Sequence, residues 1–238
     1  MTAPVRGIVF DKDGTLFDFR TTWEAWAGAF LRCAAGGDEK RATRAGHAVG
    51  FDLVASRFAR DSVVIAGTAK EIADALGTIF PEKSSQDLLD LINVEAAHAP
   101  QAEAVPLVPL LDNLRERGLQ LGVATNDAEV PARAHLDAAG IAGRFDFVAG
   151  FDSGHGGKPS PGQLLGFCAA AELPPDEVIM VGDSLHDMLA GRAAGMRCIA
   201  VLTGMALAED LAPYADAVLP DIGGLPAWLD QQATLNPE

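Results

Sequence analysis

Apolar residues along this chain gather in short runs that are separated by amphipathic stretches. The runs Val5–Phe10, Leu119–Thr125 and Glu177–Gly182 are rich in Val, Ile and Leu, which is typical of buried strands. Three further runs have the same character: Phe145–Phe151, Arg197–Leu202 and Asp216–Pro220. Strands that are apolar almost throughout predict a sheet covered on both faces.

Helical stretches lie between these predicted strands, and three of them close on a glycine. They are "LVPLLDNLRERG", Val130–Gly140, Pro161–Leu173 and Asp187–Gly195. Strands that alternate with helices of this length favour right-handed crossovers and a parallel sheet. The predicted fold class is therefore α/β, with a doubly wound parallel-sheet core of Rossmann-like type.

The stretch 19–104 interrupts this alternation, because it is rich in Ala, Glu, Arg and Leu and its pattern is mostly helical. The predicted helices are Thr21–Ala35, Glu39–Ala59, Ala69–Leu76 and Ser84–His98, while the run Ser62–Gly67 fits either a strand or a helix. We expect residues 19–104 to form a helical cap domain inserted into a core of residues 1–18 and 105–238. Hinges are expected near Asp18 and at residues 102–106.

Composition limits the range of possible functions and partners. The 238 residues are 49% hydrophobic with a net charge of −15, which favours a globular protein and disfavours nucleic acid as a partner. An anionic substrate would need a metal or placed cations. Three scattered cysteines, the lack of a signal-like start and the lack of a long apolar span indicate a cytoplasmic protein without a membrane partner. The oligomeric state is not indicated.

Polar residues follow four of the predicted strands: Asp11, Asp13, Thr125, Asn126, Lys158, Asp183 and Asp187. Ligands of parallel α/β sheets bind beyond the carboxyl ends of the strands, so these side chains are expected to converge. Residues two apart in an extended chain face the same way, so Asp11 and Asp13 should point together and Lys12 elsewhere. Such a cluster of carboxylates favours a hard divalent cation, and Mg²⁺ fits oxygen ligands.

A cation beside a lysine, a hydroxyl and an amide suits a phosphoryl group. One carboxylate could attack phosphorus and form an aspartyl phosphate, and a second could exchange protons with the leaving alcohol and with water. The bland alternatives are turn or N-cap residues, and Asp187 in particular could cap the helix that it opens. Asp18 is expected to be a loop or N-cap residue.

The segments "DKDGTLFD", "TN", "KPSP" and "GDSLHD" resemble, in order, the four motifs of the haloacid dehalogenase-like hydrolases. The likeness covers Val5 to about Ala200 and is greatest to the phosphoglycolate phosphatase branch. The resemblance implies that Asp11 is the nucleophile and Asp13 the general acid/base. It implies that Thr125, Asn126 and Lys158 hold the phosphoryl group.

By the same resemblance, Asp11, the main-chain carbonyl of Asp13 and the side chain of Asp183 would bind Mg²⁺. Asp187 would position Lys158 or metal-bound water. The family's dehalogenases lack an aspartate at position 13 and its ATPases carry threonine there, so Asp13 favours a phosphatase or phosphomutase. Lys12 replaces the commoner apolar residue, and the sequence gives no account of it.

The expected function is a Mg²⁺-dependent phosphoric monoester hydrolase that acts on a small phosphorylated metabolite such as phosphoglycolate. A phosphomutase of the β-phosphoglucomutase type is the alternative enzyme, and a non-catalytic binding protein of the same fold is a third interpretation. Trp23, Trp26 and Phe30 have helical spacing that favours core packing over substrate stacking. Arg20 could meet a substrate carboxylate or form a surface ion pair.

Overall fold

A parallel sheet of six strands organises the part of the chain that carries the four motifs. The computed structural model describes residues 3–235, so residues 1–2 and 236–238 of the predicted core domain lie outside it. The strands are β1 (Gly7–Phe10), β4 (Gln120–Ala124), β5 (Phe147–Ala149), β6 (Val178–Gly182), β7 (Arg197–Val201) and β8 (Ala217–Leu219). They lie in the order β5-β4-β1-β6-β7-β8, and every pair is parallel. The predicted α/β class is confirmed.

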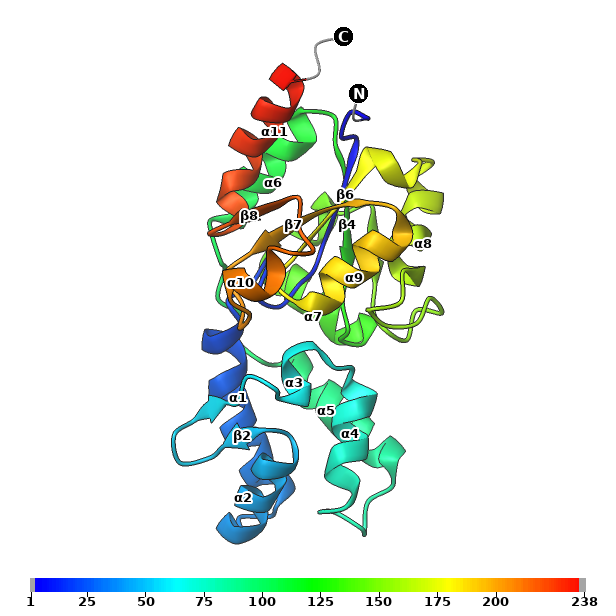
Figure 1. The fold of residues 1–238 in the computed structure, drawn as a ribbon. Helices are drawn as coiled ribbons and strands as arrows, with labels where there is room; N and C mark the ends of the chain where they lie inside the picture. Colours follow the sequence, from blue (N-terminus) through cyan, green and yellow to red (C-terminus); the bar gives the residue numbers. More distant parts are fainter. Residues whose placement is uncertain (1–2, 236–238) are drawn as a thin grey trace.

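Helices cover both faces of this sheet (Figure 1). Successive side chains of a strand point to opposite faces, so the apolar residues of each strand are buried on both sides. Ile8 and Phe10 of β1 pack in one cluster with α6 (Leu107–Glu116), α7 (Glu129–Ala138) and α11 (Leu225–Leu235). Val9 packs in the opposite cluster with α8 (Gly162–Ala171) and α9 (Leu185–Ala194). Because the strands are buried on both sides, they show the continuous apolar runs of the sequence.

The chain winds outward from β1 in both directions, which fixes the place of the site. It runs from β1 to β4 and β5 on one side, and then returns to β6, β7 and β8 on the other. The carboxyl ends of β1, β4 and β6 therefore lie side by side in the middle of the sheet. Ligands of doubly wound sheets bind at such a reversal of strand order.

The helical region (residues 19–97) lies below these strand ends in Figure 1 and has a hydrophobic core of its own. It contains α1 (Phe19–Ala34), α2 (Glu39–Ala48), α3 (Val63–Ala66), α4 (Ala69–Gly77) and α5 (Ser85–Ala97). The helix starts are well specified, because Asp18, Asp38, Thr68 and Ser84 accept backbone N–H groups as N-caps. The prediction that Asp18 is an N-cap is confirmed.

The predicted helix Glu39–Ala59 is wrong beyond Ala48. Gly50 has a φ of +72°, and a Cβ there would lie 2.8 Å from the Cα of Ser62, so the chain turns sharply at this glycine. A short hairpin follows, made of β2 (Phe51–Asp52) and β3 (Arg57–Phe58), with Asp52 Oδ1 accepting two backbone N–H groups in its loop. The run Ser62–Gly67, which the sequence left open, contains α3.

Two adjacent segments of the chain, residues 16–18 and 102–104, connect the helical region to the sheet. The backbone N–H of Asp18 donates to the carbonyl of Ala102 at 2.8 Å, and that of Ala104 donates to Leu16 at 2.9 Å. The outgoing and returning segments are thus paired where they pass between the two regions.

None of the helices within residues 3–235 combines the length and the apolar character that a bilayer crossing requires.

Candidate active site

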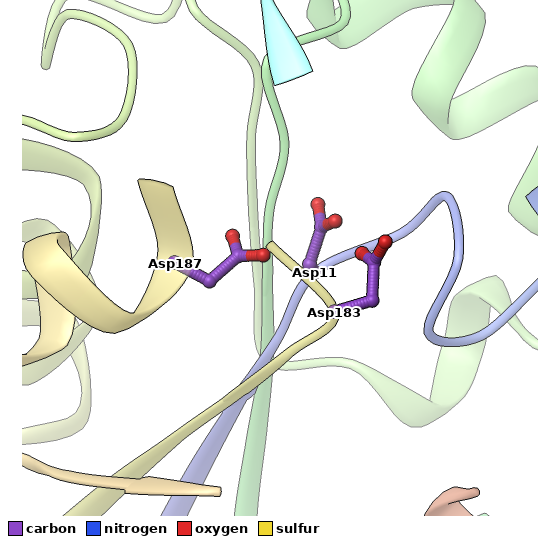
Figure 2. Close-up of side chains that lie close together, drawn as sticks. All are labelled: Asp11, Asp183 and Asp187. Atoms are coloured by element: carbon purple, nitrogen blue, oxygen red, sulfur yellow. The ribbon is translucent and has the colours of Figure 1, made fainter. Parts of the chain in front are cut away.

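Three buried aspartates meet at the carboxyl edge of the sheet. Asp11 follows β1, Asp183 follows β6, and Asp187 lies in the first turn of α9. Each offers a carboxylate oxygen within 4.8 Å of the others, and Figure 2 shows the three side chains converging from two strand ends and a helix. The convergence predicted for these residues is observed.

Close backbone approaches hold Asp183 in place. A Cβ at Gly14 or at Gly204 would clash with Asp183 Oδ2. Gly14 also has a φ of +80°, so the turn after β1 needs glycine for its conformation as well as for space. The Asp183 carboxylate therefore sits in a cradle that only glycines leave open.

Burial and the neighbouring carboxylates raise the pKa values of Asp11 and Asp183. Burial raises the pKa of Asp11 to about 7, with Lys158 partly offsetting the effect and Asp187 adding to it. Burial and the neighbouring Asp11 and Asp187 likewise hold the pKa of Asp183 well above its ordinary value. A divalent cation would relieve this repulsion, so the donor set fits a hard metal ion that prefers oxygen.

Lys158 is the cation of this cluster. It is buried, and its Nζ lies 2.7 Å from Asp11 Oδ1 and 2.6 Å from Asp187 Oδ1. Burial alone lowers the pKa of an amine, but Asp11 and Asp187 outweigh it and the pKa of Lys158 lies above its ordinary value. A permanently charged ammonium therefore stands beside Asp11.

Asn126 positions the loop that carries Lys158, and Thr125 lies next to it at the end of β4. Asn126 donates from Nδ2 to the Lys158 carbonyl at 3.0 Å and accepts the Lys158 backbone N–H at 2.8 Å. The Thr125 hydroxyl accepts the backbone N–H of Asp127 at 3.1 Å, and both Thr125 and Asn126 line the cavity beside Asp11. The amide thus fixes the lysine's backbone, a contact that the motif alone does not reveal.

Asp187 performs both tasks that the sequence offered as alternatives. Its Oδ2 accepts the backbone N–H and the hydroxyl of Ser184, which closes a capping box at the start of α9. Its Oδ1 accepts from Lys158. One carboxylate therefore starts the helix and orients the lysine.

A second buried lysine lies next to this cluster. Lys12 is fully buried, with its Nζ 2.7 Å from Asp13 Oδ2 and 3.0 Å from Asp127 Oδ2. Burial alone would lower the pKa of Lys12, but Asp127 and Asp13 outweigh it and the pKa is raised. This contact explains the lysine for which the sequence gave no account.

Lys12, Asp13 and Asp127 form a second cluster beside the first, which consists of Asp11, Asp183, Asp187 and Lys158. The second cluster extends through His135 into the helical region. Lys12 Nζ lies 3.0 Å from Nδ1 of His135, and Nε2 of His135 lies 2.7 Å from the carbonyl oxygen of Ala96 in α5. The carbonyl can only accept, so Nε2 carries the proton and Nδ1 accepts from the ammonium. Burial, together with the charge of Lys12, lowers the pKa of His135 to about 4 and keeps the ring neutral.

Asp13 stands between the two regions as well. Its Oδ1 accepts from the indole N–H of Trp23 in α1 at 2.8 Å, and its carboxylate also pairs with Lys12. Trp23 and Trp26 line the cavity that contains Asp11 and Asp13, so these rings face the site besides packing in the helical region. The sequence interpretation favoured core packing over substrate stacking: the packing is confirmed, and the position of the two rings at the cavity is an additional finding.

Sequence reasoning also missed Asp127 and His135. The signal for Asp127 was present, because it follows Thr125 and Asn126 at a strand end and a lysine inside an apolar run needs a buried partner. His135 offered no such signal, since a histidine in the middle of an amphipathic helix is common. Its contact depends on how α5 and α7 pack.

Comparison with known proteins places this site in a family. A family model described as haloacid dehalogenase-like hydrolase matches residues 5–195. The chain belongs to this family. The four motifs, from Asp11 to Asp187, lie within the match.

Relatives of this haloacid dehalogenase-like hydrolase include several phosphatases. The phosphoglycolate phosphatase of Rhodospirillum rubrum is 36% identical over 120 residues, which is 50% of this chain and 50% of that protein. The N-acetylmuramic acid 6-phosphate phosphatase of Pseudomonas putida is 30% identical over 212 residues, covering 87% of this chain and 86% of that one. The crystal structure of CbbY from Rhodobacter sphaeroides in complex with phosphate shares the fold, with 22% identity and a TM-score of 0.69 over 95% of this chain and 99% of that chain.

Proposed function

We propose that this haloacid dehalogenase-like hydrolase is a Mg²⁺-dependent phosphatase that hydrolyses small phosphate monoesters through an aspartyl phosphate on Asp11. The observation that carries the proposal is the buried triad of Asp11, Asp183 and Asp187 with Lys158 bonded to two of its members. The names of the relatives support a phosphatase, and phosphoglycolate is the substrate that the Rhodospirillum rubrum name suggests.

The proposed reaction has two steps. A carboxylate oxygen of Asp11 attacks phosphorus, the bond from phosphorus to the alcohol oxygen breaks, and Asp13 gives its proton to that oxygen. Water then attacks the phosphoryl group and returns a proton to Asp13, and the bond from phosphorus to Asp11 breaks to release phosphate. Lys158 and Thr125 hold the phosphoryl oxygens, and Asn126 keeps Lys158 in place.

The cation would be held by Asp11, the main-chain carbonyl of Asp13 and Asp183. When bound, Mg²⁺ supplies positive charge to the phosphoryl oxygens and offsets the repulsion between the carboxylates. Asp187 then acts through Lys158. We further propose that residues 19–104 form a cap domain that closes over the substrate and excludes bulk water, with hinges near Asp18 and at residues 102–106.

The test is phosphate release from a panel of small phosphate monoesters, with Mg²⁺ or with EDTA, for the wild type and Asp11→Asn. We expect release that requires the metal and vanishes in the variant. Asp137→Asn is the matched control, because it makes the same change at an exposed position of α7. Release that persists in Asp11→Asn would overturn the mechanism.

A further inference from the structure

The wall that the helical region presents to Asp11 and Asp13 is apolar and aromatic. Eleven residues of this region line the cavity: Phe19, Trp23, Trp26, Val64, Ile65, Gly67, Ala69, Ile72, Ile92, Asn93 and Ala96. Asn93 has the only polar side chain among them apart from the two indole N–H groups. None of these described lining residues is charged.

A second anion on the substrate would find no counter-charge at this wall. Lys158 is bonded to Asp11 and Asp187, and Lys12 is bonded to Asp13 and Asp127. Arg20, the residue that the sequence offered for a substrate carboxylate, is exposed and is not among the residues that line the described cavity. A buried carboxylate without a cation is strongly disfavoured.

The two tryptophans define the shape of the wall and its hydrogen bonding. Trp23 and Trp26 meet edge to face with ring centroids 5.0 Å apart, and Phe30 stacks on Trp26 at 4.9 Å. The Trp23 N–H is used by Asp13. The Trp26 N–H is buried and, within the described residues, has no hydrogen-bond partner. A buried donor without a partner calls for an acceptor, which a bound substrate can provide.

We propose that the site takes phosphate monoesters of neutral alcohols that have an apolar face and an acceptor within reach of Trp26. Such substrates are preferred over carboxylated ones, such as phosphoglycolate, and over hexose phosphates, whose several hydroxyls exceed the few polar groups of the wall. This inference rests on the proposed phosphatase function, and it departs from the substrate that the relative's name suggests.

The decisive comparison is between phosphoglycolate and isobutyl phosphate, which has an uncharged isopropyl group of similar size in place of the carboxylate. Wild-type enzyme with Mg²⁺ should show a kcat/KM for isobutyl phosphate at least about tenfold higher. The kcat/KM for benzyl phosphate, which can stack on the tryptophans, should also exceed the kcat/KM for glucose 1-phosphate. A kcat/KM for phosphoglycolate equal to or above that for isobutyl phosphate would overturn the proposal.

Variants of the wall test the cause. Ile72→Arg places a guanidinium on the wall and should move the preference towards phosphoglycolate, whereas Ile72→Met, with a similar volume and no charge, should not. Trp26→Phe keeps an aromatic ring and removes the N–H. It should therefore lower kcat/KM more for substrates whose alcohol part carries a hydrogen-bond acceptor than for isobutyl phosphate, whose alcohol part carries none. An unchanged preference in Ile72→Arg would contradict the role assigned to the wall.

Binding of non-hydrolysable analogues separates this inference from the proposed function. Calorimetry with 3-methylbutylphosphonate and 3-phosphonopropionate measures the same selectivity without turnover. Preference for the neutral phosphonate, with no phosphate released from any ester, would uphold the wall and overturn the hydrolysis. Preference for the carboxylated phosphonate, with Asp11-dependent release, would uphold the hydrolysis and overturn the wall.

Discussion

Lys158 and Lys12 are buried at the same edge of the sheet, and each lies between two aspartates. The first cluster has a third carboxylate, Asp183, and therefore more negative charge than its lysine can offset. The second cluster is more nearly balanced, and it continues through a neutral histidine to the carbonyl of Ala96.

The difference shows two uses of one arrangement. In the first cluster, burial and the surplus of carboxylates raise the pKa values of Asp11 and Asp183, and this donor set fits a cation of the kind that the proposed chemistry at phosphorus needs. In the second cluster, the lysine orients Asp13 and links the sheet to the helical region. The predictions below test this contrast by damaging one cluster at a time.

Of the two lysine variants, Lys158→Met should have the larger effect on activity. It removes a buried charge aimed at the phosphoryl group, so kcat/KM should fall by roughly 10²–10³-fold. Phosphate release under saturating Mg²⁺ measures the loss, and Lys40→Met is the control because Lys40 is exposed on α2. Nearly normal turnover in Lys158→Met would show that Lys158 has no role in the reaction.

Lys12→Met should reduce activity less and should also destabilise the fold. We expect a loss of roughly 10–10²-fold in kcat/KM because Asp13 loses its orientation. Two carboxylates are left without their cation, which costs on the order of 3–5 kcal/mol of unfolding free energy.

Urea unfolding of the double variant Lys12→Met/Asp127→Asn separates the two effects. It should recover part of the stability, because one unpaired carboxylate is neutralised, without recovering the rate. Recovery of both would mean that Lys12 serves the fold alone.

Metal binding should weaken in acid because a proton competes for the first cluster. The pKa of Asp11 is raised to about 7, so below that pH the metal-free site holds a proton that the cation must displace. Mg²⁺ affinity should fall by roughly tenfold per pH unit below about 7. Calorimetry at about pH 8 and about pH 5.5 measures this, and Asp11→Asn should show a shallower dependence.

The smallest effect is expected from the histidine of the second cluster. Its folded pKa of about 4 lies below the ordinary 6.5, so between these values the unfolded chain binds a proton that the folded chain does not. His135 therefore makes stability fall as the pH drops from about 6.5 towards 4, by at most about 1.4 kcal/mol per unit.

The difference in unfolding free energy between wild type and His135→Gln should show this slope. His98→Gln, at an exposed position after α5, serves as its control. An equal slope for the two variants would show that His135 is not held neutral.

The two clusters also differ in how far the sequence predicted them. Asp11, Asp183 and Lys158 follow apolar strands, and strand ends of a parallel sheet must meet, so their convergence followed from topology. Lys12 contacts His135 of α7, and His135 contacts the carbonyl of Ala96 through the packing of α5 on α7, which no local pattern specifies. The hairpin after Ala48 was missed for a similar reason, since Gly50 turns against Ser62 from a different part of the chain.

The paired segments at Leu16–Asp18 and Ala102–Ala104 have a consequence for how such a protein can change over time. Because both ends of the helical region leave the sheet side by side, the whole region is one contiguous block whose exchange would leave the strand order intact. A new specificity could therefore come from replacing one stretch of sequence, provided that the new stretch keeps the contacts of Trp23 with Asp13 and of Ala96 with His135.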